Sequence, residues 1–260
     1  MAKVIAIINQ KGGVGKTTTA VNLSALLGAM GQRVLMIDFD PQGNTTSGLG
    51  MEVDDKSIYE VIMGRMKLTD VMEETEFKNL SIAGSDVRLA NAELELVEVE
   101  KREYRLKTAV QSVQQDFDFI FIDCPPSLGL LTINALGAAD SVLIPIQCEY
   151  YALEGVASLM NTISRVKKTI NPHLEIEGVL LTMLDGRTNL GLQVVDEVKK
   201  HFKKQVYATV IPRSVRLGEA PSHGEPIHVY DKRSAGCVAY VNLAKEVLKR
   251  NNIKVKEFKL

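Results

Sequence analysis

A glycine-rich turn between an apolar strand and a helix is the feature that most constrains how this chain folds. Val4 to Asn9 forms a short apolar run typical of a buried strand, and a helix is predicted from Thr17 to Met30. The connecting sequence NQKGGVGKTT occupies residues 9–18. Glycines let the backbone wrap closely around a triphosphate with its N–H groups pointing inward, and the helix presents its positive N-terminal end to the same anion. The order of strand, loop and helix therefore predicts a P-loop nucleotide site.

Individual residues of this loop are expected to bind different parts of a magnesium–ATP complex. Lys16 would bridge the β- and γ-phosphates, the Thr17 hydroxyl would bind Mg²⁺, and Thr18 would hydrogen-bond the α-phosphate. The usual spacing places a glycine at position 10, where this chain has Gln10, and a second lysine, Lys11, precedes the glycine pair. A glycine turn without a ligand is the alternative, which the G-K-T-T ending disfavours. The loop residues predicted to contact ATP are Lys11, Gly12, Gly13, Val14, Gly15, Lys16, Thr17 and Thr18.

Three carboxylates at strand ends complete the predicted site. Asp123 ends the apolar run that begins at Phe119, as in a Walker B segment, and would hold a water bound to Mg²⁺. Asp38 and Asp40 follow a strand beginning at Val34, at the edge where open α/β sheets bind ligands. Asp40 is expected to position or polarise the attacking water, and Asp38 to brace the Mg²⁺ shell or the loop, with a purely structural turn as the alternative. The predicted metal-site residues are Thr17, Asp40 and Asp123, and the loop and strand motifs predict Lys16 and Asp40 as catalytic.

Short apolar runs alternate with longer segments of helical period along the whole chain. This pattern predicts one α/β domain over residues 1–260, with a doubly wound, mostly parallel sheet and helices on both faces. The segment from Gly43 to Arg88 has no readable pattern. The predicted strands are Val4–Asn9, Val34–Phe39, Phe119–Asp123, Val142–Ile146, Val179–Met183 and Val206–Ile211. The predicted helices are Thr17–Met30, Asn91 to about Gln115, Leu153–Thr169, Leu190–Lys204 and Ala235–Arg250, with Gly31 ending the first.

Net charge, cysteine positions and the length of the apolar runs argue against several classes of protein. The formal net charge of -1 lacks the strongly basic signature of a dedicated nucleic-acid protein, so any DNA binding has to be local. The cysteines Cys124, Cys148 and Cys237 are far apart, which argues against a disulfide framework or a structural zinc site. The sequence predicts no export signal, and no apolar run approaches the roughly 20 residues of a membrane span.

Several motifs together resemble the ParA/MinD ATPases with a deviant Walker A box. The loop from Lys11 to Thr17 carries the signature lysine, and the other motifs look like the chromosomal ParA branch called Soj. Because they are spread over nearly the whole chain, the combination is more specific than any one motif. The matching segments are Asp38–Asn44, Asp123–Ser127, Gln147–Gly155, Leu181–Thr188 and Ile211–Gly224.

This resemblance implies an ATP-driven homodimer in which Lys11 reaches the nucleotide of the partner subunit and joins the catalytic residues. It also implies adenine contacts from Pro212 and Arg213, with Val215 and Met183 as further neighbours. Family members bind double-stranded DNA without sequence preference, and a ParB-type partner stimulates their ATP hydrolysis further. A cytoplasmic, nucleoid-associated protein is therefore expected.

Basic residues near the last predicted strands are the DNA candidates. Arg187 and Arg216 lie inside the shared motifs, and four lysines end the helix that precedes the last strand. Those lysines would also complement the helix dipole without any ligand, so DNA contact and a solvated helix end both remain open for them. The complete set is Arg187, Lys199, Lys200, Lys203, Lys204 and Arg216.

Two other classes share the phosphate loop. A MinD-like membrane ATPase would use a basic amphipathic tail, for which Val241 to Arg250 is a candidate, although a final helix packed on the sheet is favoured. A small-molecule enzyme, either a ligase or an iron–sulfur reductase, is the other. The reductase would need cysteines that bridge two subunits, whereas the three cysteines here are expected to be small buried hydrophobes.

Overall fold

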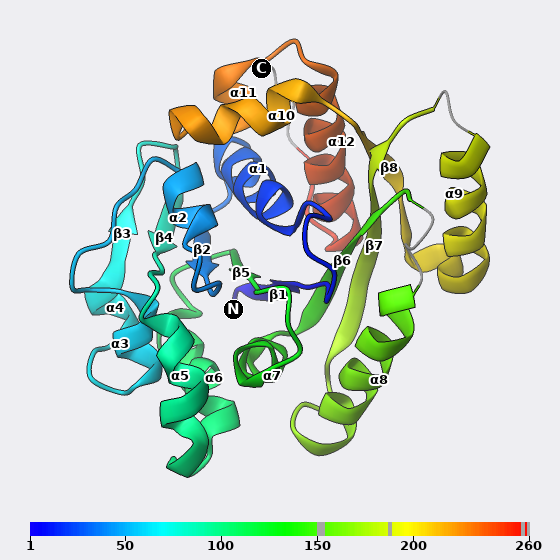
Figure 1. Ribbon diagram of the computed structural model, residues 1–260. Coiled ribbons are helices and arrows are strands. Elements are labelled where there is room, and N and C mark those ends of the chain that lie inside the picture. Colours follow the sequence, from blue (N-terminus) through cyan, green and yellow to red (C-terminus); the bar gives the residue numbers. More distant parts are fainter. Residues whose placement is uncertain (150–153, 187–188, 256–257, 259–260) are drawn as a thin grey trace.

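The computed structural model describes residues 1–149, 154–186, 189–255 and 258. In these residues a single sheet runs through the molecule in the order β3-β4-β2-β5-β1-β6-β7-β8 (Figure 1). All neighbouring strands are parallel except β3, which pairs antiparallel with β4 at one edge. The strands are β1 (Lys3–Ile7), β2 (Val34–Asp38), β3 (Met72–Glu74), β4 (Leu80–Ala83), β5 (Phe119–Asp123), β6 (Ser141–Gln147), β7 (Glu175–Leu184) and β8 (Val206–Pro212). The predicted doubly wound α/β class is confirmed.

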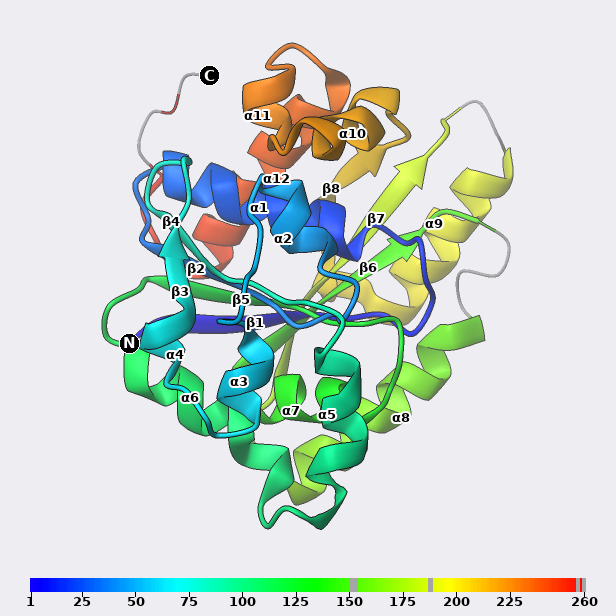
Figure 2. The same cartoon turned by 60° about the vertical axis from the view of Figure 1, so that its left-hand side comes forward.

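Helices cover both faces of the sheet, as the two views show (Figures 1 and 2). One face carries α1 (Lys16–Ala29), α2 (Asn44–Gly48), α10 (Val215–Glu219), α11 (Ile227–Tyr230) and α12 (Ala235–Arg250). The other carries α3 (Ile58–Ile62), α4 (Leu68–Val71), α5 (Leu89–Glu95), α6 (Arg105–Val113), α7 (Leu130–Ala138), α8 (Glu154–Thr169) and α9 (Asn189–Phe202).

Each face of the sheet has its own hydrophobic core. Alternate residues of β1 divide between them: Val4 and Ala6 pack with one core, and Ile5 and Ile7 with the other. A strand buried on both faces has to be apolar at every position, which is why β1 reads as a continuous hydrophobic run. The same requirement accounts for the confirmed predictions of β2, β5, β6 and the middle of β7, whereas β8 is an edge strand in which only Tyr207 and Ile211 are buried.

The final helix is packed into the second core. Within α12, Leu243 and Val247 are fully buried, and the helix lies against α1 and β8. Its basic residues Lys249 and Arg250 fall in the last turn. The packed-helix interpretation of Val241 to Arg250 is thus confirmed over that of a free amphipathic tail. Among the described residues, no helix is long and apolar enough to cross a bilayer.

The predicted helix from Asn91 to about Gln115 is wrong. α5 is followed by the short 3-10 turns η1 (Leu96–Glu98) and η2 (Arg102–Tyr104) before α6 begins. Val99 is extended, and Lys101 adopts a left-handed conformation with φ of 54°. The apolar residues of α5 and those of α6 both pack on the first core, and one straight helix would not bring both sets there. Tertiary packing therefore overrides a continuous helical propensity.

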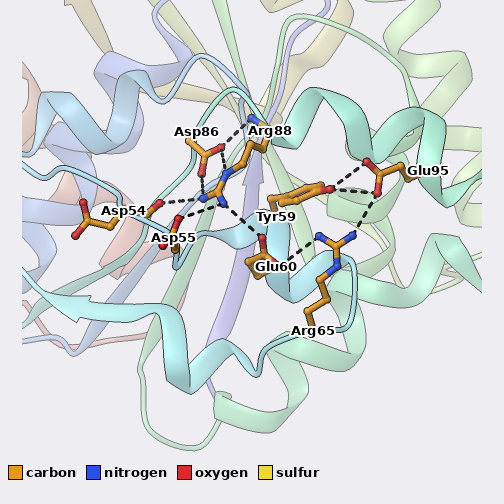
Figure 3. A network of polar contacts seen from close by, with 8 residues as sticks. All are labelled: Asp54, Asp55, Tyr59, Glu60, Arg65, Asp86, Arg88 and Glu95. Carbon is orange, nitrogen blue, oxygen red and sulfur yellow. Dashed lines mark hydrogen bonds and ion pairs between the residues drawn. The ribbon is translucent and has the colours of Figure 1, made fainter.

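The segment that had no readable pattern, Gly43 to Arg88, contains α2, α3, α4 and the edge strands β3 and β4. A network of ion pairs and hydrogen bonds joins its far end to α3 and α5 (Figure 3). Arg88 and Arg65 are its cations, and the ring of Tyr59 lies beneath both guanidinium groups. Long-range polar contacts hold this segment in place, and a local sequence pattern does not encode them.

Candidate nucleotide site

The loop between β1 and α1 has the conformation of an anion-binding turn. Gly13 and Gly15 adopt positive φ angles of 70° and 87°, which side chains rarely tolerate, and α1 begins at Lys16. Gln10 stands where the usual motif has glycine, and the loop still closes because the left-handed positions fall at the two later glycines. The backbone N–H groups at the start of α1 are therefore available to an anion.

Two side chains outside the loop fix its position. Asn9 accepts a hydrogen bond from the Lys11 N–H at 2.9 Å and donates to the Pro145 carbonyl of β6 at 2.7 Å. The buried Thr182 hydroxyl of β7 donates to the Val14 carbonyl at 2.8 Å. Sequence reasoning gave neither residue a role, because the loop motif contains no information about which neighbouring strands it contacts.

Lys16 is a buried cation whose hydrogen-bonding capacity is only partly used. Its ammonium group donates to the Lys11 carbonyl at 3.3 Å, and only 7% of the residue is exposed. Burial lowers the pKa of Lys16, while the nearby Asp123, Cys124 and Asp40 oppose that shift. An ammonium group has three donor hydrogens. The position suits an anion that would restore the solvation lost on burial.

Asp123 has one satisfied oxygen and one without a partner. Its Oδ2 accepts hydrogen bonds from the hydroxyls of Thr17 at 2.8 Å and Thr45 at 2.7 Å. Its Oδ1 is buried and has no hydrogen-bond donor among the described residues. Burial, followed by the charge of Asp38, raises the pKa of Asp123 to about 7. A fully buried carboxylate in this condition calls for a cation or a bound water.

These oxygens fit a hydrated magnesium ion. Mg²⁺ prefers hard oxygen ligands, keeps several waters, and binds through one or two carboxylates together with phosphates. The Thr17 hydroxyl and the free oxygen of Asp123 offer such ligands at the start of α1. No cluster of three His, Cys, Asp or Glu side chains that would hold a metal by itself occurs in the described residues. A metal here would therefore depend on a nucleotide for part of its coordination.

Asp38 holds the strand-to-helix connection after β2. Its Oδ2 accepts from the Thr46 N–H at 2.8 Å and the Thr46 hydroxyl at 2.7 Å, and its Oδ1 accepts from the Asp40 N–H at 3.3 Å. Burial raises the pKa of Asp38 to about 6. These contacts hold the connection to α2 rather than the phosphate loop, so the expected bracing of the Mg²⁺ shell or the loop by Asp38 stays a prediction. Asp40 itself is 7% exposed and accepts from the Gln42 N–H at 3.0 Å, so its carboxylate is oriented at the edge of the site.

The residues expected near adenine are distributed around two adjacent strand ends. Leu184 of β7 pairs with Pro212 of β8, and Met183 reaches the loop, where a Cβ on Gly15 would lie 3.8 Å from its Cε. Val215 is 76% exposed at the start of α10. Arg213 instead directs its guanidinium to Glu149, at 3.1 Å. The structure thus places Met183 beside the phosphate loop and engages Arg213 with a protein carboxylate.

The DNA candidates do not form one cluster. Lys199 and Lys200 are exposed at the end of α9, with Lys200 paired to Glu197, and Lys203 and Lys204 follow in the turn η4 (Lys203–Gln205). Arg216 lies on α10, over the opposite face of the sheet, and pairs with Glu219 and Asp231. Arg187 lies outside the described residues.

The three cysteines are all buried. Cys124 directly follows Asp123 and is fully inaccessible, and burial raises the pKa of its thiol. Cys148 and Cys237 are likewise enclosed by hydrophobic packing. The expected role as small buried hydrophobes fits these positions, whereas a cluster bridging two subunits would need thiols at the surface.

The sequence comparisons and the structural comparison find proteins described with two different activities. A family described as an AAA domain matches residues 2–176. The chain is 59% identical over 249 residues to the sporulation initiation inhibitor protein Soj of Bacillus subtilis, covering 95% of this chain and 98% of that protein. It is 51% identical over 256 residues to the chromosome partitioning protein ParA of Myxococcus xanthus, covering 98% and 90% of the two chains. Among solved structures, one from Mycobacterium smegmatis, described as cobyrinic acid a,c-diamide synthase with bound ADP and magnesium, has a TM-score of 0.86 and 37% identity, covering 97% of this chain and 96% of that one.

Proposed function

This chain belongs to the Soj/ParA family of P-loop partitioning ATPases, and on that basis we propose that ATP binding joins two copies into a dimer that binds DNA, and that hydrolysis separates them. The observation that carries the proposal is the incomplete polar site at the start of α1. Lys16 has unused donors and Asp123 has an unpaired oxygen, so both are completed by a magnesium–nucleotide complex.

Each residue of the site then has a definite task. Lys16 would bind the terminal phosphates, and Thr17 and Asp123 would hold a magnesium ion, which would supply positive charge beside the phosphates. Thr45 orients Asp123 by its hydrogen bond to the same oxygen that Thr17 contacts. Asp40 positions the attacking water at the edge of the site. Asp38 acts one step further away, since it holds the Asp40 backbone through the Asp40 N–H.

Lys11 is the residue through which assembly would control hydrolysis. Its side chain is 36% exposed, and its ammonium group lies 3.9 Å from Glu149, which follows β6. A cation delivered to a neighbouring phosphoryl group contributes roughly 10³ to 10⁵ in rate in related phosphoryl transfers. We therefore assign to Lys11 a contact with the triphosphate of the partner subunit.

DNA binding follows from joining two weak basic surfaces. Arg216 and the lysines at the end of α9 are exposed, and Arg216 and Lys200 are partly neutralised by acidic neighbours, so one subunit alone has low affinity for phosphates. Two tethered copies gain avidity without any new contact. The dimer is accordingly the nucleoid-associated form in the cytoplasm, and a ParB-type centromere-binding protein stimulates its hydrolysis.

The proposed control of dimerisation by ATP can be tested by sedimentation with ADP, ATP and a non-hydrolysable ATP analogue, each with and without plasmid DNA. We expect a dimer with ATP and the analogue only, and co-sedimentation with DNA in those two conditions only. Lys16→Ala is the control for nucleotide binding and should remain monomeric throughout. Equal dimerisation with ADP, or in the absence of nucleotide, would contradict the proposal.

Arg216→Ala tests the DNA surface. We expect the ATP-bound dimer to lose about tenfold in affinity for duplex DNA at low salt, with a smaller loss as salt is raised, because each phosphate contact releases counterions. Arg65→Ala is a matched control, since Arg65 is also about half exposed and paired with two acidic residues, Glu60 and Glu95. Equal losses in both variants would show that the effect is not a local phosphate contact.

The Mycobacterium smegmatis structure favours a second candidate, an ATP-dependent ligase acting on a small carboxylic acid. Its 37% identity is below the 59% shared with Soj, which is why we rank it second. The two functions differ in what increases ATP turnover. Stimulation by plasmid DNA supports the partitioning ATPase. Turnover that depends on a carboxylic acid and an amide donor, without any effect of DNA, would support the ligase.

A further inference from the structure

Glu149 is the meeting point of three segments at the edge of the nucleotide site. Its Oε1 is 3.1 Å from the Arg213 guanidinium and accepts a hydrogen bond from the Gln147 side chain at 2.6 Å. Its Oε2 is 3.9 Å from the Lys11 ammonium group. Lys11 follows β1, Gln147 ends β6, and Arg213 follows β8, so one carboxylate gathers side chains from three strand ends.

The contact with Lys11 is the loosest of the three. Arg213 and Gln147 are both at hydrogen-bond distance and hold the carboxylate in place, whereas the ammonium group of Lys11 is beyond that distance. The Lys11 backbone is fixed separately, because its N–H donates to Asn9 and its carbonyl accepts from Lys16. Only the side chain of Lys11 is therefore free to change partner.

We propose that Glu149 is a positioning residue that retains the Lys11 side chain on its own subunit and releases it to the nucleotide of the partner. This inference rests on the proposed function, in which Lys11 acts in trans. The retained conformation raises the threshold for assembly, because the Lys11–Glu149 contact has to be lost before the dimer contact forms.

The strengths of the two competing contacts fit such a role. Lys11 is 36% exposed and Glu149 is 47% exposed, and an ion pair in this setting shifts an equilibrium by no more than about fivefold. A triphosphate carries several negative charges and therefore exceeds a single carboxylate as a partner for an ammonium group. The cluster of Lys11, Arg213 and Glu149 also has a net charge of +1, so an anion remains attractive there. The Glu149 carboxylate therefore raises the protein concentration needed for dimerisation without preventing it.

The position of Arg213 supports this interpretation. The resemblance to ParA proteins implied an adenine contact for it, yet its guanidinium lies on Glu149 while its N–H donates to the Leu184 carbonyl at 3.2 Å. By occupying one oxygen of Glu149, Arg213 leaves the other oxygen directed at Lys11. Arg213 thus determines which way the carboxylate faces.

The experiment compares wild type with Glu149→Gln by sedimentation equilibrium in saturating ATP analogue and magnesium. Glutamine keeps the length of the side chain and removes its charge. We expect the dimer of the variant to form at about two- to fivefold lower protein concentration at low salt. The difference should shrink when salt is raised, because the retained pair is screened.

Two controls isolate the action on Lys11. In a Lys11→Ala background, Glu149→Gln should no longer shift the dimerisation constant, as a double-mutant cycle requires for residues that act through each other. Glu197→Gln, which removes another exposed glutamate paired with a lysine, should leave the constant unchanged. A melting temperature equal to that of wild type would verify that the Glu149→Gln fold is intact.

The possible failures can be told apart. If wild type itself does not dimerise with the ATP analogue, the proposed function fails. If wild type dimerises and Glu149→Gln dimerises equally or more weakly, Glu149 does not retain Lys11, and the proposal of ATP-dependent dimerisation is unaffected. A shift of the same size in the Lys11→Ala background would likewise overturn the proposal, since Glu149 would then act through another residue.

Discussion

Two polar clusters in this molecule differ in how completely their charges are satisfied. In the network around Tyr59, Arg88 pairs with Asp86 at 2.8 Å and Arg65 bridges Glu60 and Glu95 (Figure 3). Burial alone would raise the pKa of Asp86, but the hydrogen bonds and the charge of Arg88 lower it below its ordinary value. Each charged side chain in Figure 3 is either exposed to solvent or paired with an opposite charge. The cluster is complete without any ligand.

The nucleotide site has the opposite character. Asp123 is fully buried with one oxygen unpaired, and burial raises its pKa to about 7. Asp38 nearby is also fully buried, and its pKa is raised to about 6. A chain retains such groups at a cost in stability when they serve binding or catalysis. The unpaired buried oxygen of Asp123 therefore makes this cluster the better candidate for a functional site than the ion pairs around Tyr59.

The largest effect is expected from Asp40→Ala. Removing the group that we propose positions the attacking water should lower the ATP turnover number by about 10² to 10⁴ while leaving ATP affinity within a few-fold of wild type. Phosphate release measures the first quantity, and fluorescence of a labelled nucleotide measures the second. Unchanged turnover would remove the assignment of Asp40.

Asp86→Ala is the matched control for Asp40. It deletes an aspartate of the Tyr59 network that pairs with Arg88, so it should lower the free energy of unfolding and leave turnover unchanged. If Asp86→Ala lost turnover as strongly as Asp40→Ala, the distinction between the two clusters would not hold.

A smaller effect, of opposite sign on stability, is expected from Asp123→Asn. Removing the negative charge relieves the burial of an unpaired carboxylate and its repulsion with Asp38, so the free energy of unfolding of the nucleotide-free protein should rise by about 1–3 kcal/mol at pH 8. Turnover with magnesium should fall, because the variant loses a metal-binding oxygen. Urea unfolding without magnesium measures the gain.

The pH dependence of that gain has a definite sign. Because the folded-state pKa of Asp123 is about 7 and the unfolded value about 3.9, the folded wild type binds the extra proton between these limits, and its stability falls as pH rises through that window. The difference between Asp123→Asn and wild type should therefore be greatest above pH 7 and shrink toward pH 4. A difference independent of pH would contradict the charge of Asp123 as its cause.

The sequence predicts one of these regions and not the other, for a physical reason. The phosphate loop and the aspartates at the ends of β2 and β5 can be predicted from short stretches of sequence. A loop that needs left-handed positions contains glycines, and a buried strand is a continuous apolar run. Thr45 and Thr182 reach the same site from distant segments, and no local pattern indicates their hydrogen bonds. Glu149 lay inside a shared motif, yet its contacts with Lys11 and Arg213 depend on the meeting of three strand ends.

The Tyr59 network was hidden for the same reason. Arg88, Arg65 and Glu95 are separated along the chain and come together only after α3 and α5 have packed. The break in the predicted helix at Val99 to Lys101 has a similar cause. The apolar residues of α5 and those of α6 pack on the same core, and the chain turns between the two helices to bring both sets there. The pairing of β3 with β4 is short, and β4 has only four residues, of which three are apolar.

The smallest effect is expected from Tyr59→Phe, which removes one hydrogen bond from the satisfied network. The Tyr59 hydroxyl donates to Glu95 at 3.0 Å, while both guanidinium groups would keep their stacking on the ring. We expect a loss of about 0.5–1.5 kcal/mol in the free energy of unfolding and no change in ATP turnover. Tyr207→Phe is the matched control, because the Tyr207 hydroxyl is buried without a hydrogen-bond partner in the described part of the chain, so its removal should cost nothing or stabilise the fold. Equal losses in the two variants would show that the hydroxyl–carboxylate bond adds nothing, and that the network is held by its ion pairs and ring contacts alone.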